Sequence, residues 1–141
     1  MPRKPVSRKP EPRKSVPAAA VVALSTVLFA LPALAQGDAA AGKKVFRKCA
    51  ACHTVDAGNR VGPSLAGIVG RAVASVEGFR YSPAMQEFAA DGKAWDEARL
   101  AEYVAAPKAM VKGTSMAFAG IRKDQEIADL IAYLRDPAAA P

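Results

Sequence analysis

The sequence has few of the residues from which metal and redox sites are usually built. Its 141 residues include one histidine, His53, and two cysteines, Cys49 and Cys52. A structural zinc site takes four ligands from Cys and His, so a site built from these residue types falls one ligand short. No stretch gives a strand signal as clear as the helical ones, and no segment repeats. The sequence therefore excludes a Cys/His zinc site and gives no sign of a sheet.

Positive charge is also scarcer than the whole chain suggests. The net charge is +7, but residues 1–35 carry +5 of it, which leaves +2 for residues 36–141. Phosphate binding requires a dense basic surface. The composition therefore argues against nucleic acid as a partner.

The first 35 residues have the pattern of a secretory signal peptide. Basic residues fill the leader up to Lys14, and an uncharged run follows from Ser15 to Gly37. The sequence Ala33-Leu34-Ala35 is a small-x-small cleavage pattern, so we expect residues 1–35 to be removed and residues 36–141 to form the mature domain. The alternative is an uncleaved membrane anchor, because an apolar run approaching about 20 residues can span a bilayer.

The sequence Cys49-Ala50-Ala51-Cys52-His53 has the spacing of a c-type haem attachment site. In such a site the two thiols add to the vinyl groups of a haem, and the adjacent imidazole is an axial ligand of the iron. A disulfide or a thioredoxin-like dithiol would use only the two cysteines and would not need the histidine. A thiol oxidoreductase remains the alternative, and free thiols without covalent haem would identify it.

Helical periodicity is present in four segments of the mature chain. Three of them begin with an aspartate that we expect to be an N-cap, namely Asp38, Asp96 and Asp124. The fourth covers residues 83–90, and Pro107 should stop the helix that follows Asp96.

Breaker residues between these segments predict loops over 54–70, with at most a short helix at 64–69, and over 107–120, and the last four residues should fray. We therefore predict an all-α domain of three to four short helices, with long loops wrapped around one haem.

The second axial ligand cannot be another imidazole of this chain, because His53 is the only histidine. Methionine, lysine, water or an open position remain. Met116 lies in the irregular stretch Gly113-Thr114-Ser115-Met116, and Met110 is its competitor, whereas Met85 is expected to fill a gap in the core. A thioether is soft and neutral and raises the reduction potential, which suits one-electron transfer rather than oxygen chemistry. Spacing favours Met116 but leaves Met110 open.

Several segments together resemble class I cytochrome c, the small soluble carriers with one covalent haem. The resemblance extends from Gly37 to Leu134 and rests on Cys49-Ala50-Ala51-Cys52-His53-Thr54-Val55, Gly62-Pro63-Ser64-Leu65, Phe79-x-Tyr81-Ser82, Gly113-Thr114-x-Met116 and Asp129-Leu130-Ile131-Ala132-Tyr133-Leu134. It implies the class I fold, in which the terminal helices cross, here with Gly42 and Phe46 against Leu130 and Tyr133.

The same resemblance implies roles for individual residues. Met116 would be the distal ligand, and the carbonyl of Pro63 would accept a hydrogen bond from the His53 ring. The hydroxyl of Tyr103 would neighbour the ligand sulfur. Four further residues would surround the haem propionates, namely Arg71, Tyr81, Trp95 and Thr114.

The resemblance also implies a function. The chain would be a monomeric electron carrier of the bacterial periplasm, not an enzyme, and would move single electrons between membrane-bound respiratory or photosynthetic complexes and terminal acceptors. Lys48, Lys108 and Lys112 are candidates for a ring that docks acidic partners. Two alternatives remain: a haem enzyme or gas-binding protein with an open distal position, and a membrane-anchored cytochrome if the leader is not cleaved.

Overall fold

The computed structural model describes residues 37–141, so the predicted leader, residues 1–35, lies outside the described residues. The helices are α1 (Ala39–Phe46), α2 (Pro83–Ala89), α3 (Glu97–Ala105), α4 (Pro107–Met110), α5 (Asp124–Arg135) and the 3-10 helix η1 (Pro137–Ala139). No strand occurs among residues 37–141, so the all-α prediction is confirmed. The structure adds two helices to the four segments that the sequence indicated. These two, α4 and η1, are single turns and are too short to show helical periodicity. None of the helices in this part of the chain is long and apolar enough to cross a membrane.

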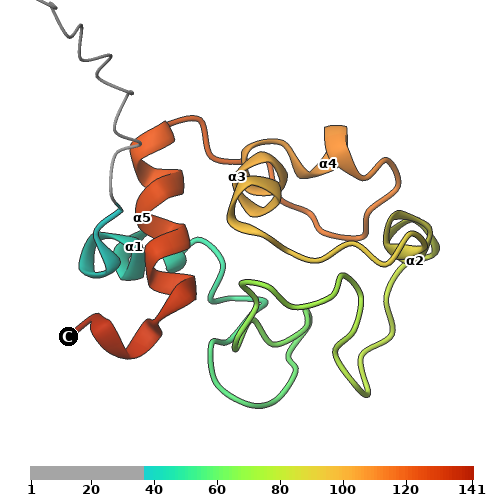
Figure 1. The fold of residues 1–141 in the computed structure, drawn as a ribbon, viewed down its shortest axis with the longest axis horizontal. Helices are drawn as coiled ribbons and strands as arrows, with labels where there is room; N and C mark the ends of the chain where they lie inside the picture. Colours follow the sequence, from blue (N-terminus) through green and yellow to red (C-terminus); the bar gives the residue numbers. More distant parts are fainter. Residues whose placement is uncertain (1–36) are drawn as a thin grey trace, which may run out of the picture. The chain divides into compact units, whose positions relative to one another are not determined.

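Helices α1 and α5 cross and pack against each other (Figure 1). Gly42 allows this contact, because a Cβ added there would lie 2.8 Å from Tyr133 Cβ and closer still to the carbonyl oxygen of Asp129. The rings of Phe46 and Tyr133 pack at a centroid distance of 5.3 Å. Leu130, in the middle of α5, is 1% exposed. The predicted crossing at Gly42 and Phe46 is confirmed.

Two of the three predicted aspartate caps are present. Asp38 Oδ1 accepts from two backbone N–H groups in the first turn of α1, at 2.7 and 3.2 Å, and Asp96 Oδ1 accepts from one in α3 at 2.7 Å. The prediction for Asp124 was wrong: the helix already includes it, and Lys123 precedes it without a side-chain cap. Asp124 and Glu126 instead place negative charge in the first turn, where the helix dipole favours it.

Two further predictions at chain breaks need correction. Helix α3 does end before Pro107, but residues 107–110 are not irregular, since Pro107 is the first residue of α4, a position that needs no N–H donor. The last four residues do not fray. Lys43 Nζ donates to the carbonyls of Ala140 and Pro141 at 3.3 and 2.6 Å, and Ala140 is buried. The ammonium group of Lys43 on α1 therefore holds the last residues in place. This contact joins distant parts of the chain, so the local sequence does not reveal it.

The long loops are fixed by a few backbone pairings. Residues 64–69 contain turns and no helix, so the short helix that the sequence permitted there is absent. Ala72 and Ala94 form an antiparallel bridge. Beside it the N–H of Trp95 donates to the carbonyl of Arg71 at 2.8 Å. These pairings bring the chain around Arg71 next to the chain around Trp95, and both residues line a cavity that is described below.

Candidate functional site

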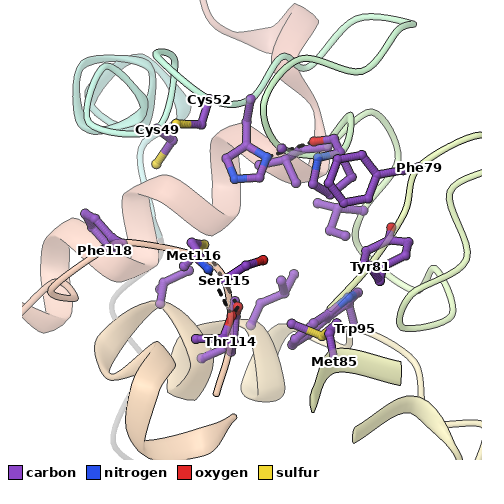
Figure 2. Close-up of a pocket in the computed structure, with 18 of the residues that line it drawn as sticks. Cys49, Cys52, Phe79, Tyr81, Met85, Trp95, Thr114, Ser115, Met116 and Phe118 are labelled. Atoms are coloured by element: carbon purple, nitrogen blue, oxygen red, sulfur yellow. Dashed lines mark hydrogen bonds between the residues drawn. The ribbon is translucent and has the colours of Figure 1, made fainter. Parts of the chain in front are cut away.

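One cavity of about 300 Å³ lies among the loops and helices of the described domain. Its wall contains all ten predicted site residues: Cys49, Cys52, His53, Pro63, Arg71, Tyr81, Trp95, Tyr103, Thr114 and Met116. Figure 2 shows the two cysteines on one side of the cavity and Thr114 on the opposite side, with Tyr81 and Trp95 along a further wall. Apolar side chains such as Ile68, Leu100 and Leu130 also line the cavity.

The two cysteines follow directly from the end of α1. The chain turns tightly there, since the N–H groups of Cys52 and His53 both donate to the carbonyl of Cys49, at 3.0 and 2.9 Å. Both thiols are free, and burial raises the pKa of the Cys49 thiol. A dithiol redox centre needs the opposite shift, because its nucleophile is a thiolate. The turn therefore presents two thiols and one imidazole to the cavity.

The His53 ring is held in one orientation. Its Nδ1 lies 2.8 Å from the carbonyl oxygen of Pro63, so Nδ1 carries the proton and donates it to this bond. The lone pair is then on Nε2, which leaves that nitrogen able to bind a metal. The backbone of Gly62 packs against the ring, because a Cβ added there would lie 2.8 Å from Nδ1, 2.9 Å from Nε2 and closer still to Cε1.

Met116 reaches the cavity from the loop between α4 and α5. Its sulfur accepts from the hydroxyl of Tyr103 at 3.9 Å, and its N–H donates to Thr114 Oγ1 at 3.2 Å. The Tyr103 hydroxyl also lies 3.5 Å from Thr114 Oγ1. Burial raises the pKa of Tyr103, against a smaller opposing effect of the Thr114 hydrogen bond, so the phenol stays a protonated donor. Met110 does not line the cavity, whereas Met116 does.

Arg71, Tyr81 and Trp95 form another part of the wall. The guanidinium of Arg71 donates to the carbonyls of Ser64 and Ala66, at 2.8 and 2.7 Å, and burial lowers its pKa. Arg71 therefore fixes the loop that follows Pro63, in addition to facing the cavity. The hydroxyl of Tyr81 accepts from the N–H of Val76 at 3.3 Å.

Three cavity features were missed from the sequence. The rings of Trp95 and Tyr103 pack in a tilted arrangement at a centroid distance of 4.9 Å. Met85, expected only to fill the core, also lines the cavity. The contact of Gly62 with the imidazole was not predicted either, although a glycine directly before Pro63 was a signal of close backbone approach. In the two pairs the partner lies eight or nine residues away along the chain, beyond the reach of helical periodicity.

The residues present fit a covalently bound haem. The cavity supplies two thiols for attachment, an imidazole with its free lone pair on Nε2, a thioether, and apolar walls for the macrocycle. The guanidinium of Arg71 and the hydroxyl of Tyr81 are polar groups that suit buried carboxylates. An all-α chain with this cavity belongs to the class of c-type haem proteins that carry one haem.

Comparison with known proteins gives the particular family. The family model for cytochrome c matches residues 39–137. The chain is 51% identical over 100 residues to cytochrome c-550 of Nitrobacter winogradskyi, covering 70% of this chain and 89% of that protein. It is 45% identical over 106 residues to cytochrome c2 of Blastochloris viridis, covering 74% and 80%. The solved structure of cytochrome cH from Methylobacterium extorquens matches with a TM-score of 0.65 and 43% identity, over 70% of this chain and 98% of that one.

The chain therefore belongs to the cytochrome c family, with the class I fold. It binds one covalent haem c and transfers single electrons to redox partners, and it is an electron-transfer protein rather than an enzyme. The sequence predictions of the family, the fold, the cofactor and the electron-carrier function are confirmed.

Proposed function

We propose that His53 and Met116 are the axial ligands of the haem iron, and that Cys49 and Cys52 carry its thioether bonds. The observation that supports this proposal is their convergence: an imidazole from the loop after α1 and a thioether from the loop before α5 line the same cavity. Bound haem supplies a one-electron couple between ferrous and ferric iron. A neutral thioether favours the reduced state and fills the position that small molecules would otherwise take.

The surrounding residues keep this pair of ligands in place. Pro63 orients the His53 ring, and Tyr103 and Thr114 hold the Met116 sulfur and backbone. A ligand set held by hydrogen bonds changes little in geometry when the charge of the site changes, which keeps electron transfer fast. In this proposal Arg71, Tyr81, Trp95 and Thr114 lie around the propionates, where their donors offset the cost of burying negative charge.

Replacing Met116 with alanine tests the distal assignment. We expect the variant to lose the long-wavelength charge-transfer band of a thioether-ligated ferric haem, and its ferrous form to bind carbon monoxide rapidly. The matched control is Met110→Ala, which removes a thioether outside the cavity wall and should keep both properties of the wild type. Loss of the band in Met110→Ala with its retention in Met116→Ala would assign the ligand to Met110.

We also propose that the carrier works in the bacterial periplasm after removal of residues 1–35. The basic leader, the uncharged run and the Ala33-Leu34-Ala35 pattern support this localisation. Intact mass measurement of the protein from its native host should give residues 36–141 plus one haem. A mass that includes the leader would favour the membrane-anchored form.

The proposed partners are membrane-bound complexes that donate and accept electrons, met transiently by a monomeric carrier. Lys108 and Lys112 are exposed near the Met116 loop, and Lys48, which lines the cavity, is half exposed in its ion pair with Glu126 at 2.5 Å. Attraction between exposed charges is screened over about 8 Å at physiological salt. The rate of electron transfer to an acidic partner should therefore fall as salt rises, in stopped-flow measurements. A salt-independent rate would contradict docking through these lysines.

A further inference from the structure

The peptide group between Pro63 and Ser64 is hydrogen-bonded at both of its polar atoms. Its carbonyl oxygen accepts from His53 Nδ1 at 2.8 Å, and its N–H donates to the side-chain oxygen of Asn59 at 2.9 Å. Asn59 and His53 therefore bond to opposite ends of one amide plane. Asn59 does not line the cavity, so this peptide group is its route to the site.

The plane of this amide is fixed by the rest of Ser64, which is 6% exposed. The hydroxyl of Ser64 donates to the carbonyl of Asp56 at 2.6 Å and accepts from the N–H of Ala66 at 3.1 Å. Its own carbonyl accepts from Arg71 at 2.8 Å. Every polar group of Ser64 is thus bonded, so the amide cannot rotate to find another acceptor if Asn59 is lost.

Hydrogen bonds in a chain polarise one another. When an amide N–H donates to an acceptor, electron density moves toward the carbonyl oxygen of the same amide, which becomes the stronger acceptor. A stronger acceptor at Nδ1 makes the imidazole the more basic ligand through its other nitrogen. A more basic ligand stabilises the oxidised iron and lowers the reduction potential.

We propose that Asn59 is a positioning residue that tunes the His53 imidazole through the Pro63–Ser64 amide, and so contributes to the reduction potential. This inference rests on the proposed role of His53 as an axial ligand. The second half of the Asn59 side chain supports the geometry, since Nδ2 donates to the carbonyl of Glu77 at 3.3 Å. That bond ties the Asn59 side chain to the loop that carries Tyr81.

The test compares three variants of the haem-loaded protein. Asn59→Ala removes both bonds, whereas Asn59→Asp keeps an oxygen acceptor for the Ser64 N–H and loses the donor to Glu77. Gln86→Ala is the matched control, because it truncates an exposed side-chain amide that makes no hydrogen bond within residues 37–141. The readouts are amide hydrogen exchange at Ser64, the NMR signal of the His53 Nδ1 proton in the ferrous state, and the potential.

We expect Asn59→Ala to speed exchange at Ser64 about tenfold, because a part-buried donor loses its acceptor. The His53 Nδ1 proton signal should move upfield, and the potential should become more positive than in wild type and in Gln86→Ala. Asn59→Asp should move the proton signal downfield, because a charged acceptor polarises the amide more strongly. The added negative charge of Asn59→Asp also changes the reduction potential directly. For this variant the His53 Nδ1 proton signal is therefore the readout that tests the inference.

An unchanged His53 proton signal and potential in Asn59→Ala would overturn the inference. Should Asn59→Ala fail to retain haem, an unmoved proton signal in Asn59→Asp overturns it instead. Failure of the proposed function looks different: the wild-type protein would then lack the spectrum of histidine and methionine ligation before any variant is made.

Discussion

Replacing Gly62 with alanine should displace the His53 imidazole and reduce haem retention more than any other single methyl group added near the site. The added Cβ would lie 2.8 Å from Nδ1 and 2.9 Å from Nε2 of the ring. The ring cannot move away freely, because its Nδ1 donates to the carbonyl of Pro63. The backbone of Gly62 cannot move away freely either, because its N–H donates to the carbonyl of Cys52 at 2.8 Å. Overpacking of this kind costs about 1–3 kcal/mol.

The measurements are the ratio of haem to protein after expression with the maturation system, and the position of the His53 Nδ1 proton signal. A cost of that size lowers the population with native ligation by about fivefold to 150-fold. The control is Gly67→Ala. Gly67 has a φ of +60° and no atom within 4 Å of an added Cβ, so alanine there adds backbone strain without a clash.

Gly67→Ala should therefore lower the free energy of unfolding by about 1 kcal/mol and leave the His53 proton signal unchanged. Gly62 has no positive φ, so its substitution adds the clash without the strain. Equal haem retention in the two variants would show that the close approach to the imidazole has no effect on ligation.

Replacing Gly42 with alanine should cause the largest loss of global stability. In an isolated helix the change would stabilise by about 1 kcal/mol, because alanine has the better helix propensity. Here the added Cβ would lie 2.6 Å from the carbonyl carbon of Asp129 and 2.8 Å from Tyr133 Cβ, so α1 and α5 must separate. We expect a net loss of about 3 kcal/mol.

Thermal unfolding of the haem-loaded protein measures this effect. A loss of that size lowers Tm by about 10–20 °C in a domain of this length. Lys44→Ala is the control, because Lys44 is exposed on the same helix and its truncation should change the free energy of unfolding by less than about 0.5 kcal/mol. A rise in Tm for Gly42→Ala would mean that helix propensity outweighs the contact with α5.

The parts of the fold that depend on short-range chemistry could be predicted from the sequence. Asp38 and Asp96 cap their helices because the capped N–H groups lie within three residues. Asp124 was misplaced by one position, since an aspartate is also favoured inside the first turn, next to the same helix terminus. The turn at Pro107 was missed because a proline that ends one helix is equally suited to start the next.

The candidate site was predicted to a greater depth than the fold, because the ten residues come from short segments with a family resemblance. The structure places all ten on one cavity, although their roles remain proposals. What the sequence did not reveal depends on contacts between distant segments. The Asn59 side chain donates to the carbonyl of Glu77, which is 18 residues away, and no sequence pattern around Asn59 indicates that bond.

The hydrogen bond between the start of α1 and the middle of α5 has a consequence for the order of folding and haem attachment. The N–H of Asp38 donates to the carboxylate of Asp129 at 2.8 Å, across a separation of 91 residues. Contacts so far apart are slow to form, because the chain between them must first lose its freedom. The first and last helices should therefore meet late. We therefore expect attachment of the haem at Cys49 and Cys52 to precede closure of the two helices.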